Sequence, residues 1–388
     1  MKIEAWYSDY FESRLSGRYI TLEHINPILK EYKNSLEISS LGQSELGKNI
    51  PMIKIGKGKK KILAWSQMHG NESTCTKAIF DFLKFIQQKD LFQDEIRAFL
   101  NKHTLYVIPM LNPDGAELYT RENSNLVDLN RDAQDLSQKE SKILKNAFRS
   151  LNPELCLNLH GQRTIFGLEN GLPATVSFLS PAANKERELV PSRLEAMKHI
   201  VKMNKSLQKY IPGQIGRYDD SFNSNCFGDY FQMNDVPVIL FEAGHDKNDY
   251  SREKSREYIF YAFLDLFGIT KSDNGNENDY FAIPENKKNY KDVILRNIRF
   301  NENEPTFSIA IQYVEFLNKG KIVFIPRIES VVNLEGLYGH LEIQGNGDVV
   351  LVNSQNNVKI GDNILSIISN EGNSLIYLNE NGLIDKYN

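Results

Sequence analysis

The feature that most limits how this chain can fold is an alternation of short apolar runs with amphipathic helical patterns between Leu41 and Phe267. The apolar runs are closed by polar or turn residues, as is typical of buried strands, and helical patterns follow several of them. This alternation predicts an α/β fold in which a mixed, mostly parallel sheet is sandwiched by helices. The predicted strands are Ile62–Ser66, Thr104–Met110, Leu155–Leu159 and Val236–Phe241.

The composition changes after this region. A polar stretch between Lys271 and Lys291 contains little that could build a core, which indicates a linker. Short β patterns separated by Gly and Asn turns follow it and predict a small all-β domain whose role the sequence does not reveal. We therefore expect a first domain over residues 1–275, a linker over 276–291 and a β domain over 292–388.

The charge balance and the apolar pattern exclude several classes of protein. The chain carries 46 Lys and Arg against 50 Asp and Glu, a net charge of −4, so a nucleic-acid partner is not expected. No apolar run reaches the ~18 residues of a membrane span, and the first residues lack the apolar core of a signal peptide. The three cysteines form no Cys-x-x-Cys pair, which fits a reducing compartment, so we expect a cytoplasmic location. The oligomeric state is not predicted.

Histidine and glutamate residues gather where the predicted strands end. His69 and Glu72 follow the first strand, His160 follows the third, and Glu242 follows the fourth. Each has a structural explanation when taken alone; His160, for example, could be a core histidine. Ligands of open α/β sheets bind beyond the carboxyl ends of the strands, where these side chains would converge. Two imidazoles and one carboxylate are a common set of catalytic zinc ligands, so the combination predicts a zinc site.

Several motifs resemble those of the zinc carboxypeptidase superfamily, the carboxypeptidase A-like metallopeptidases. The resemblance extends from about Ser40 to Gly268 and implies a carboxypeptidase-like fold for that region. The motifs are Met68-His69-Gly70-Asn71-Glu72, Asn112-Pro113-Asp114-Gly115, Val127-Asp128-Leu129-Asn130-Arg131, Leu159-His160 and Phe241-Glu242.

The resemblance implies a metal, a base and an electrophile. His69, Glu72 and His160 would hold one Zn²⁺ per chain, which lowers the pKa of water enough to make a nucleophile at neutral pH. Glu242 would accept the proton of that water and pass it to the leaving amine. Arg121 would polarise the carbonyl of the bond that is cut.

The resemblance also implies how a substrate is held. Asn130 and Arg131 would bind the terminal carboxylate, Arg131 through a bidentate fork. Tyr218 resembles the mobile tyrosine of the family, and Gly228 and Asp229 lie in a segment that resembles its specificity loop. The expected partner is therefore a peptide or peptide-like substrate with a free C-terminal carboxylate.

Two other functions remain open at this stage. A deacylase of the succinylglutamate desuccinylase or aspartoacylase kind shares a His-Gly-Asn-Glu segment, a later His and an Asn-Arg pair. The Asn-Pro-Asp-Gly segment, which is followed by Arg121, favours the peptidase. A non-catalytic binding module on the same fold would have lost a ligand or Glu242, and neither is missing.

Overall fold

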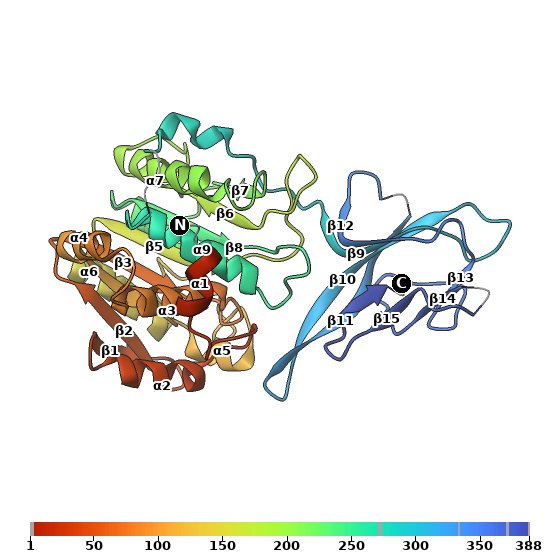
Figure 1. The fold of residues 1–388 in the computed structure, drawn as a ribbon, viewed down its shortest axis with the longest axis horizontal. Helices are drawn as coiled ribbons and strands as arrows, with labels where there is room; N and C mark the ends of the chain where they lie inside the picture. The colour runs from red at the N-terminus through yellow and green to blue at the C-terminus, as the bar shows by residue number, and fades with distance from the viewer. Residues whose placement is uncertain (1–3, 271–273, 333, 370–371, 387–388) are drawn as a thin grey trace. The chain divides into compact units, whose positions relative to one another are not determined.

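A computed structural model describes residues 4–270, 274–332, 334–369 and 372–386 of the chain. The chain divides into two compact units. We call Met1–Gln162 with Ala174–Asn286 the α/β unit, and Arg163–Pro173 with Lys287–Asn388 the β unit. Figure 1 labels the elements of both units.

The described part of the α/β unit is built on one eight-stranded mixed sheet, with the order β1-β2-β4-β3-β5-β8-β6-β7. The central neighbours β4, β3, β5 and β8 run parallel, and β2 and β6 pair antiparallel at either side of them. The predicted α/β class is therefore confirmed. The strands are β1 (Glu37–Gln43), β2 (Asn49–Gly56), β3 (Lys60–Ser66), β4 (His103–Ile108), β5 (Leu155–Gly161), β6 (Val176–Leu179), β7 (Ile215–Arg217) and β8 (Val238–Ala243).

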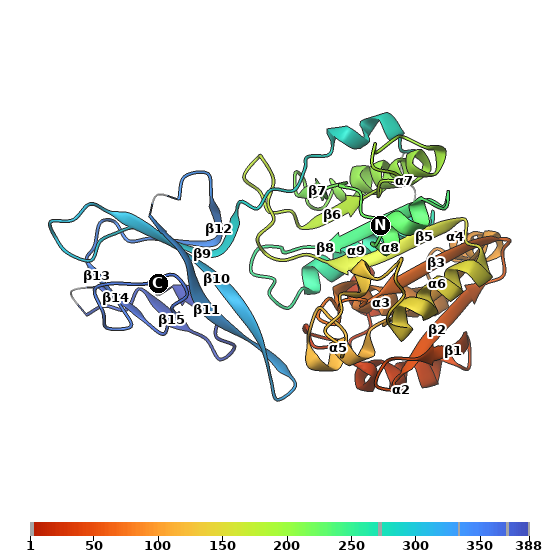
Figure 2. The ribbon, with the colours of Figure 1, turned by 180° about the vertical axis from the view of Figure 1, so that it is seen from behind.

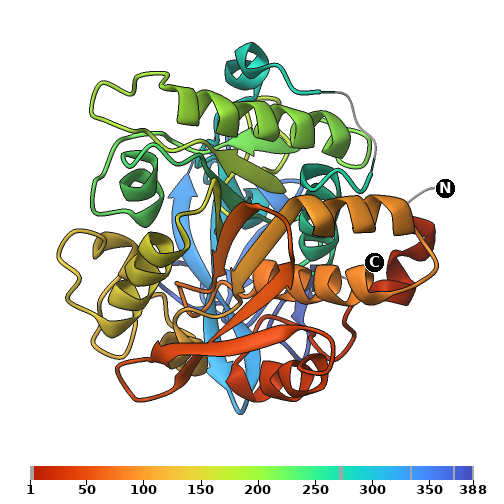
Figure 3. The ribbon, with the colours of Figure 1, turned by 90° about the vertical axis from the view of Figure 1, so that its left-hand side faces the viewer.

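Helices cover both faces of this sheet, and Figure 3 shows α3 (orange) and α6 (yellow) on opposite sides of it. They are α1 (Glu4–Tyr10), α2 (Leu22–Tyr32), α3 (Thr74–Gln87), α4 (Gln93–Lys102), α5 (Pro113–Leu118), α6 (Lys139–Leu151), α7 (Pro191–Leu207), α8 (Phe227–Gln232) and α9 (Glu253–Leu266), with the 3₁₀ helices η1 (Leu129–Arg131) and η2 (Glu277–Ala282).

The central strands are apolar on both faces because each face is covered. In β5, Leu157 and Leu159 pack in the core cluster that contains the apolar residues of α3, α7 and α9. Cys156 points the other way, into the cluster formed with α6 and α8. Strands of a two-sided core read as continuous apolar runs, which explains why the sequence pattern identified them.

The β unit contains the small all-β fold that the sequence predicts, seen on the right in Figure 1 and from behind in Figure 2. Its main sheet has the order β11-β10-β9-β12, and two strand pairs, β13–β14 and β15–β16, accompany it. The strands are β9 (Tyr290–Ile298), β10 (Phe307–Asn318), β11 (Lys321–Val332), β12 (Tyr338–Gln344), β13 (Val350–Val352), β14 (Ile367–Ser369), β15 (Ile376–Leu378) and β16 (Ile384–Lys386).

Residues 163–173, which the sequence analysis placed within 1–275, belong to the β unit. Thr164 Oγ1 accepts a hydrogen bond from Gln312 Nε2 (2.6 Å), and Ile165 O accepts one from Tyr290 N (3.1 Å). This short segment has no strand pattern and gave no sign of the β partners that it finds more than 100 residues later. The β unit is therefore connected to the chain immediately after the strand that carries His160.

The expected linker over 276–291 is also partly structured. It contains η2, whose Tyr280 is fully buried and accepts a hydrogen bond from Ser180 N at 3.0 Å. Strand β9 begins at Tyr290, before the linker was expected to end. Buried Tyr280 and Ile283, together with backbone hydrogen bonds between Arg217 and residues Pro284 and Asn286, hold this polar stretch on the α/β unit, which composition alone could not indicate.

We predict that the α/β unit folds alone when the chain ends after Asn286 and a short Gly-Ser linker replaces residues 163–173. The two ends of that segment are close, because Gln162 Nε2 donates to Ala174 O at 2.6 Å. The shortened chain should be soluble and unfold in one cooperative thermal transition. The same truncation with residues 163–173 retained is the matched comparison, because it leaves Ile165 and Leu168 without their β partners. Aggregation of both versions would contradict this division of the chain.

Candidate metal centre and active site

The parallel strands β3, β5 and β8 bring the predicted site residues to one edge of the sheet. β5 lies between β3 and β8, with His160 directly opposite Glu242 in the register. His69 and Glu72 follow β3, at the same edge. Sequence segments more than 80 residues apart therefore meet at the carboxyl ends of adjacent parallel strands.

A glycine fixes the turn that follows β3. A Cβ atom on Gly70 would lie 2.0 Å from the carbonyl carbon of Gly115, so only glycine permits this approach. Asn112 holds the same junction, because its side chain donates to Met68 O at 3.2 Å and accepts from Gly115 N at 2.9 Å. The His-Gly-Asn-Glu and Asn-Pro-Asp-Gly motifs are thus two halves of one packed turn.

Three of the predicted side chains converge closely. His69 Nδ1 lies 2.8 Å from Glu72 Oε1, and His160 Nδ1 lies 2.9 Å from Glu72 Oε2. The two Nδ1 atoms are 3.2 Å apart. Both imidazoles are buried, with 2% of each residue exposed. Gly161 N donates to Glu72 Oε2 at 3.0 Å and fixes the carboxylate from the strand side.

This donor set fits a zinc ion. The candidate ligand atoms of His69, Glu72 and His160 all lie within 4.8 Å of one another. Tetrahedral zinc with bonds of about 2.0–2.1 Å places its ligand atoms about 3.3 Å apart, close to the separations found here. His69 has a carboxylate oxygen at each ring nitrogen, Glu72 Oε1 at Nδ1 and Asp128 Oδ1 at Nε2, and a neutral imidazole can donate to only one of them. A cation bound at Nδ1 would leave the single N–H of the ring for Asp128.

Asp128 holds His69 from behind, a role that the sequence analysis did not assign to it. Its Oδ1 lies 3.1 Å from His69 Nε2, and its Oδ2 lies 2.9 Å from Arg121 Nη2. A carboxylate on the second nitrogen of a metal-binding histidine fixes the tautomer and the ring orientation. Burial opposes ionisation of Asp128, but His69 and Arg121 outweigh it and lower its pKa. The sequence signal that could have indicated this role was the position of Asp128 two residues before Asn130, within the same motif.

Glu242 lies beside this cluster and is buried, with 8% of the residue exposed. Its Oε2 has no hydrogen-bond partner among the described residues. Burial, together with the negative charge of Glu72, raises the pKa of Glu242 well above its ordinary value. A buried carboxyl group with a raised pKa is suited to accept and release a proton during a reaction.

Arg121, Asn130 and Arg131 also come to the site. Arg121 Nη1 lies 3.2 Å from His69 Nδ1. Asn130 is anchored, because its Oδ1 accepts from Phe227 N at 3.0 Å. Arg131 is exposed, and its Nη1 donates to Asn130 O at 2.7 Å and to Cys226 Sγ at 3.0 Å. Among the described residues it forms no ion pair, so its guanidinium can receive an anion.

The three remaining predicted residues lie around the same edge. Tyr218 follows β7, and its pKa is raised by burial and by the charges of Glu242 and Glu72, which places the phenol within their electrostatic reach. Gly228 and Asp229 lie in the first turn of α8, next to the Phe227 amide that binds Asn130. Burial raises the pKa of Asp229 to about 7.

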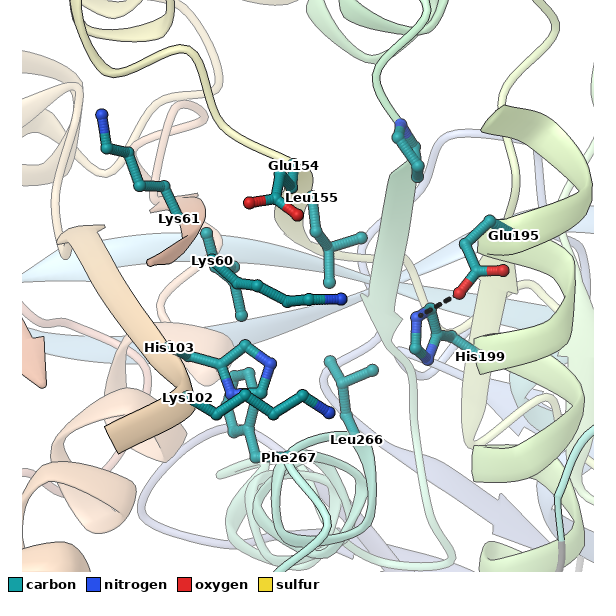
Figure 4. Close-up of a pocket in the computed structure, with 12 residues that line it drawn as sticks. Lys60, Lys61, Lys102, His103, Glu154, Leu155, Glu195, His199, Leu266 and Phe267 are labelled. Atoms are coloured by element: carbon teal, nitrogen blue, oxygen red, sulfur yellow. Dashed lines mark ion pairs between the residues drawn. The ribbon is translucent and has the colours of Figure 1, made fainter. Parts of the chain in front are cut away.

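A separate pocket of about 290 Å³ lies at the opposite, amino ends of the central strands (Figure 4). Lys60 begins β3, His103 begins β4 and Leu155 begins β5, and all three line it. Figure 4 also shows the ion pair between Glu195 and His199 at its rim. None of the predicted site residues lines this pocket, so it is distinct from the candidate active site.

The fold and the donor set together define a candidate zinc site at the carboxyl edge of an α/β sheet. Residues 21–218 match the zinc carboxypeptidase family, so the chain belongs to that family, which is zinc-dependent. The match confirms the resemblance seen in the sequence. It includes the ligand residues and Tyr218, whereas Gly228, Asp229 and Glu242 lie beyond it. None of the helices in the described ranges is long and apolar enough to cross a membrane.

Curated relatives match only parts of the chain. A γ-D-glutamyl-L-diamino acid endopeptidase 1 of Lysinibacillus sphaericus is 36% identical over 88 residues, which are 21% of this chain and 22% of that protein. Carboxypeptidase D of Homo sapiens is 25% identical over 154 residues, which are 34% of this chain and 11% of that protein. The chain therefore spans less than a quarter of the length of these two relatives.

A solved metallo-carboxypeptidase from Burkholderia cenocepacia has a similar fold. It superposes with a TM-score of 0.51 over 64% of this chain and 68% of the other, at 16% sequence identity. At this identity the likeness concerns the fold alone, and it agrees with the mixed sheet of the α/β unit.

We predict that loss of a ligand weakens zinc binding more than a change in a residue that only orients a ligand. His160→Ala should remove the bound zinc, because a ligand is lost. Asp128→Asn should keep the ligands and weaken zinc binding roughly 10- to 100-fold, because it disturbs the orientation of His69. Chelator competition with metal analysis measures both, and His199→Ala, at the opposite end of the sheet, is the control. A full zinc complement in His160→Ala would show that the ligand assignment is wrong.

We also predict that Asp229 makes stability depend on pH. Its pKa is about 7 in the fold and 3.8 as a free side chain, so between these values the native state keeps a proton that the unfolded state has lost. The free energy of unfolding therefore falls, for this group, as the pH rises through that window.

Asp229→Asn removes this loss. The Tm of the variant relative to wild type should therefore rise from about pH 5 to about pH 8. Asp235→Asn, at an exposed position nearby, is the control for the substitution itself. Parallel Tm profiles for wild type and Asp229→Asn would contradict the prediction.

Proposed function

We propose that this chain is a zinc metallocarboxypeptidase that hydrolyses the C-terminal peptide bond of a peptide or peptide-like substrate. The observation that carries the proposal is Arg131, an exposed guanidinium without an ion pair among the described residues. It follows Asn130, whose backbone N–H donates at 2.9 Å to Asp128, the carboxylate that contacts the candidate ligand His69. An unpaired cation next to a hydrolytic metal site suits a substrate that presents a free carboxylate near the bond to be cut.

Zinc held by His69, Glu72 and His160, one ion per chain, would lower the pKa of water from about 15.7 towards about 7. Glu242 is the group that would receive the proton. Its buried Oε2 has no partner, and its raised pKa, set by burial and by Glu72, lets it hold the proton until the amine leaves. The oxygen of the water would add to the acyl carbon and the C–N bond would break, while the proton passes from the water to Glu242 and on to the leaving nitrogen, so that the hydrolysis balances.

Arg121 would stabilise the negative charge that develops on the carbonyl oxygen, and the Asn130–Arg131 pair would bind the terminal carboxylate of the substrate. Arg121 Nη1 lies 3.2 Å from His69 Nδ1, so it can donate to a carbonyl oxygen as negative charge develops there. Asn130 and Arg131 lie side by side in η1 and would bind the terminal carboxylate, Arg131 with both arms of its guanidinium. Tyr218, Gly228 and Asp229 would enclose the terminal residue.

The deacylase and the non-catalytic module explain less of this arrangement. The packed turn between Gly70 and Gly115 makes the Asn-Pro-Asp-Gly segment a part of the site, as the peptidase hypothesis requires. A binding module has no need of a buried carboxyl group whose Oε2 lacks a partner beside a metal site.

A second candidate substrate comes from the relative in Lysinibacillus sphaericus, whose name gives a γ-D-glutamyl-L-diamino acid bond as its target. Its 36% identity over 88 residues favours a test of that bond in this chain. Mass spectrometry of the products from γ-D-glutamyl-L-lysine peptides and from ordinary α-linked peptides, side by side, decides between the two substrate classes.

We predict that Glu242→Gln keeps the fold and the zinc but lowers kcat roughly 10²- to 10⁴-fold, because a carboxamide cannot accept the proton. Steady-state kinetics and metal analysis of the same preparation test this. Glu195→Gln, which lies in the pocket at the opposite end of the sheet, is the control for a general effect of the substitution. Near-normal turnover by Glu242→Gln would move the role of the base to another carboxylate.

We predict that wild type cleaves a free-acid peptide far faster than its C-terminal amide. A hydrogen bond to a charged group contributes about 1.5–3 kcal/mol, so Arg131→Ala should reduce this preference roughly 10- to 100-fold while zinc is retained. Arg131→Lys should restore only part of it, since an ammonium cannot form the planar fork. Arg149→Ala, an exposed arginine on α6, serves as the control. Equal wild-type rates on acid and amide would rule out the carboxypeptidase function.

A further inference from the structure

Asn158 is a buried polar side chain that the proposed chemistry does not use. Only 1% of the residue is exposed, and neither its Nδ2 nor its Oδ1 has a hydrogen-bond partner among the described residues. Buried amides are nearly always paired on both sides, because an unmade hydrogen bond leaves the cost of desolvation uncompensated. This exception lies two residues before His160 on β5.

The strand geometry places Asn158 next to the site. Residues two apart on a strand point to the same face, so Asn158 and His160 lie on one side of the sheet. Their positions along the strand are about 6.6 Å apart, which is one row of side chains. In the register, Asn158 stands between Trp65 on β3 and Leu240 on β8, in the row adjacent to the His160–Glu242 row. Trp65 Nε1 is likewise buried without a partner.

Gly228 lies against the buried amide of Asn158 on the α8 side and has no side chain to contact it. A Cβ atom at position 228 would lie 3.5 Å from Asn158 Nδ2 and 3.2 Å from Pro181 Cγ. A larger side chain there would occupy the space in front of the amide. Gly228 also follows Phe227, whose amide anchors Asn130, so this space adjoins the residues proposed to bind the terminal carboxylate.

We propose that Asn158 determines specificity by pairing with a carboxamide side chain on the C-terminal residue of the substrate, glutamine or asparagine. This inference rests on the proposed function. A carboxamide offers one donor group and one acceptor, which match the free Oδ1 and Nδ2 of Asn158. The neighbours Trp65, Leu240, Pro181 and Gly228 carry no charge, so a buried ionic side chain would lack a counter-charge in this row. An apolar side chain would leave both amide atoms unpaired.

The test compares peptides that differ only in their C-terminal residue, which is Gln, Met or Glu. The side chains of these three residues have similar lengths. Wild type should show a kcat/KM for Gln at least about tenfold higher than for Met and for Glu, because a site built to hydrogen-bond a side chain rejects analogues that cannot pair. In Asn158→Leu the ratio of Gln to Met should fall to about one or below. Cys156→Ala, one row further along the same face of β5, is the matched control and should keep the wild-type ratio.

A binding measurement separates recognition from turnover. On the Glu242→Gln background, calorimetry should give the same order of affinities, and Asn158→Leu should abolish the advantage of Gln. Gly228→Ala, which sets a methyl group in front of the amide, should lower the ratio of Gln to Met even where Asn158→Leu fails to fold. Thermal melting and zinc content identify any misfolded variant.

The outcomes distinguish the two proposals. Cleavage of free-acid peptides with no advantage of Gln over Met, or an advantage that survives Asn158→Leu, overturns the role of Asn158 and leaves the carboxypeptidase function intact. Failure to cleave any of these peptides contradicts the proposed function and this inference with it.

Discussion

The structure of the site depends on one partly buried carboxylate, that of Glu72, which lies between the imidazoles of His69 and His160. A carboxylate in this position is stable only when its neighbours compensate for the lost hydration. The two ring nitrogens and the amide of Gly161 do so in part. A cation bound by all three side chains would complete the compensation, and this is the physical basis of the proposed metal site.

The remaining parts of the site can be understood as supports for that cluster. The parallel register of β5 and β8 sets Glu242 beside His160, and the close contact of Gly70 with Gly115 fixes the turn that carries His69. Asp128 joins His69 to Arg121 through one carboxylate. The residues proposed to bind substrate therefore share their anchors with the residues proposed to hold the metal. A substitution of Asp128 should therefore affect both metal binding and substrate binding.

Much of this could be predicted from the sequence, for identifiable reasons. Strands covered on both faces read as plain apolar runs, which revealed β3, β5 and β8, and the His-x-x-Glu motif indicated the metal. The insertion of residues 163–173 in the β unit could not be predicted, because this segment forms only isolated β bridges and therefore has no strand periodicity of its own. Tyr280 anchors η2 within a stretch that looked like a linker. Asp128 was part of a motif but had no role of its own, and Asn158 was not named, because the roles proposed for them rest on shared or unpaired atoms that only three-dimensional contacts reveal.

The most direct test of the account is a crystal structure of the zinc-loaded protein with anomalous scattering measured at the zinc absorption edge. The account predicts one strong peak in the α/β unit, within about 2.0–2.2 Å of His69 Nδ1, His160 Nδ1 and a Glu72 carboxylate oxygen. Arg131 should remain free of carboxylates from the chain itself. A zinc peak at other residues, or histidine coordination through Nε2, would contradict the assignment on which the proposed function depends.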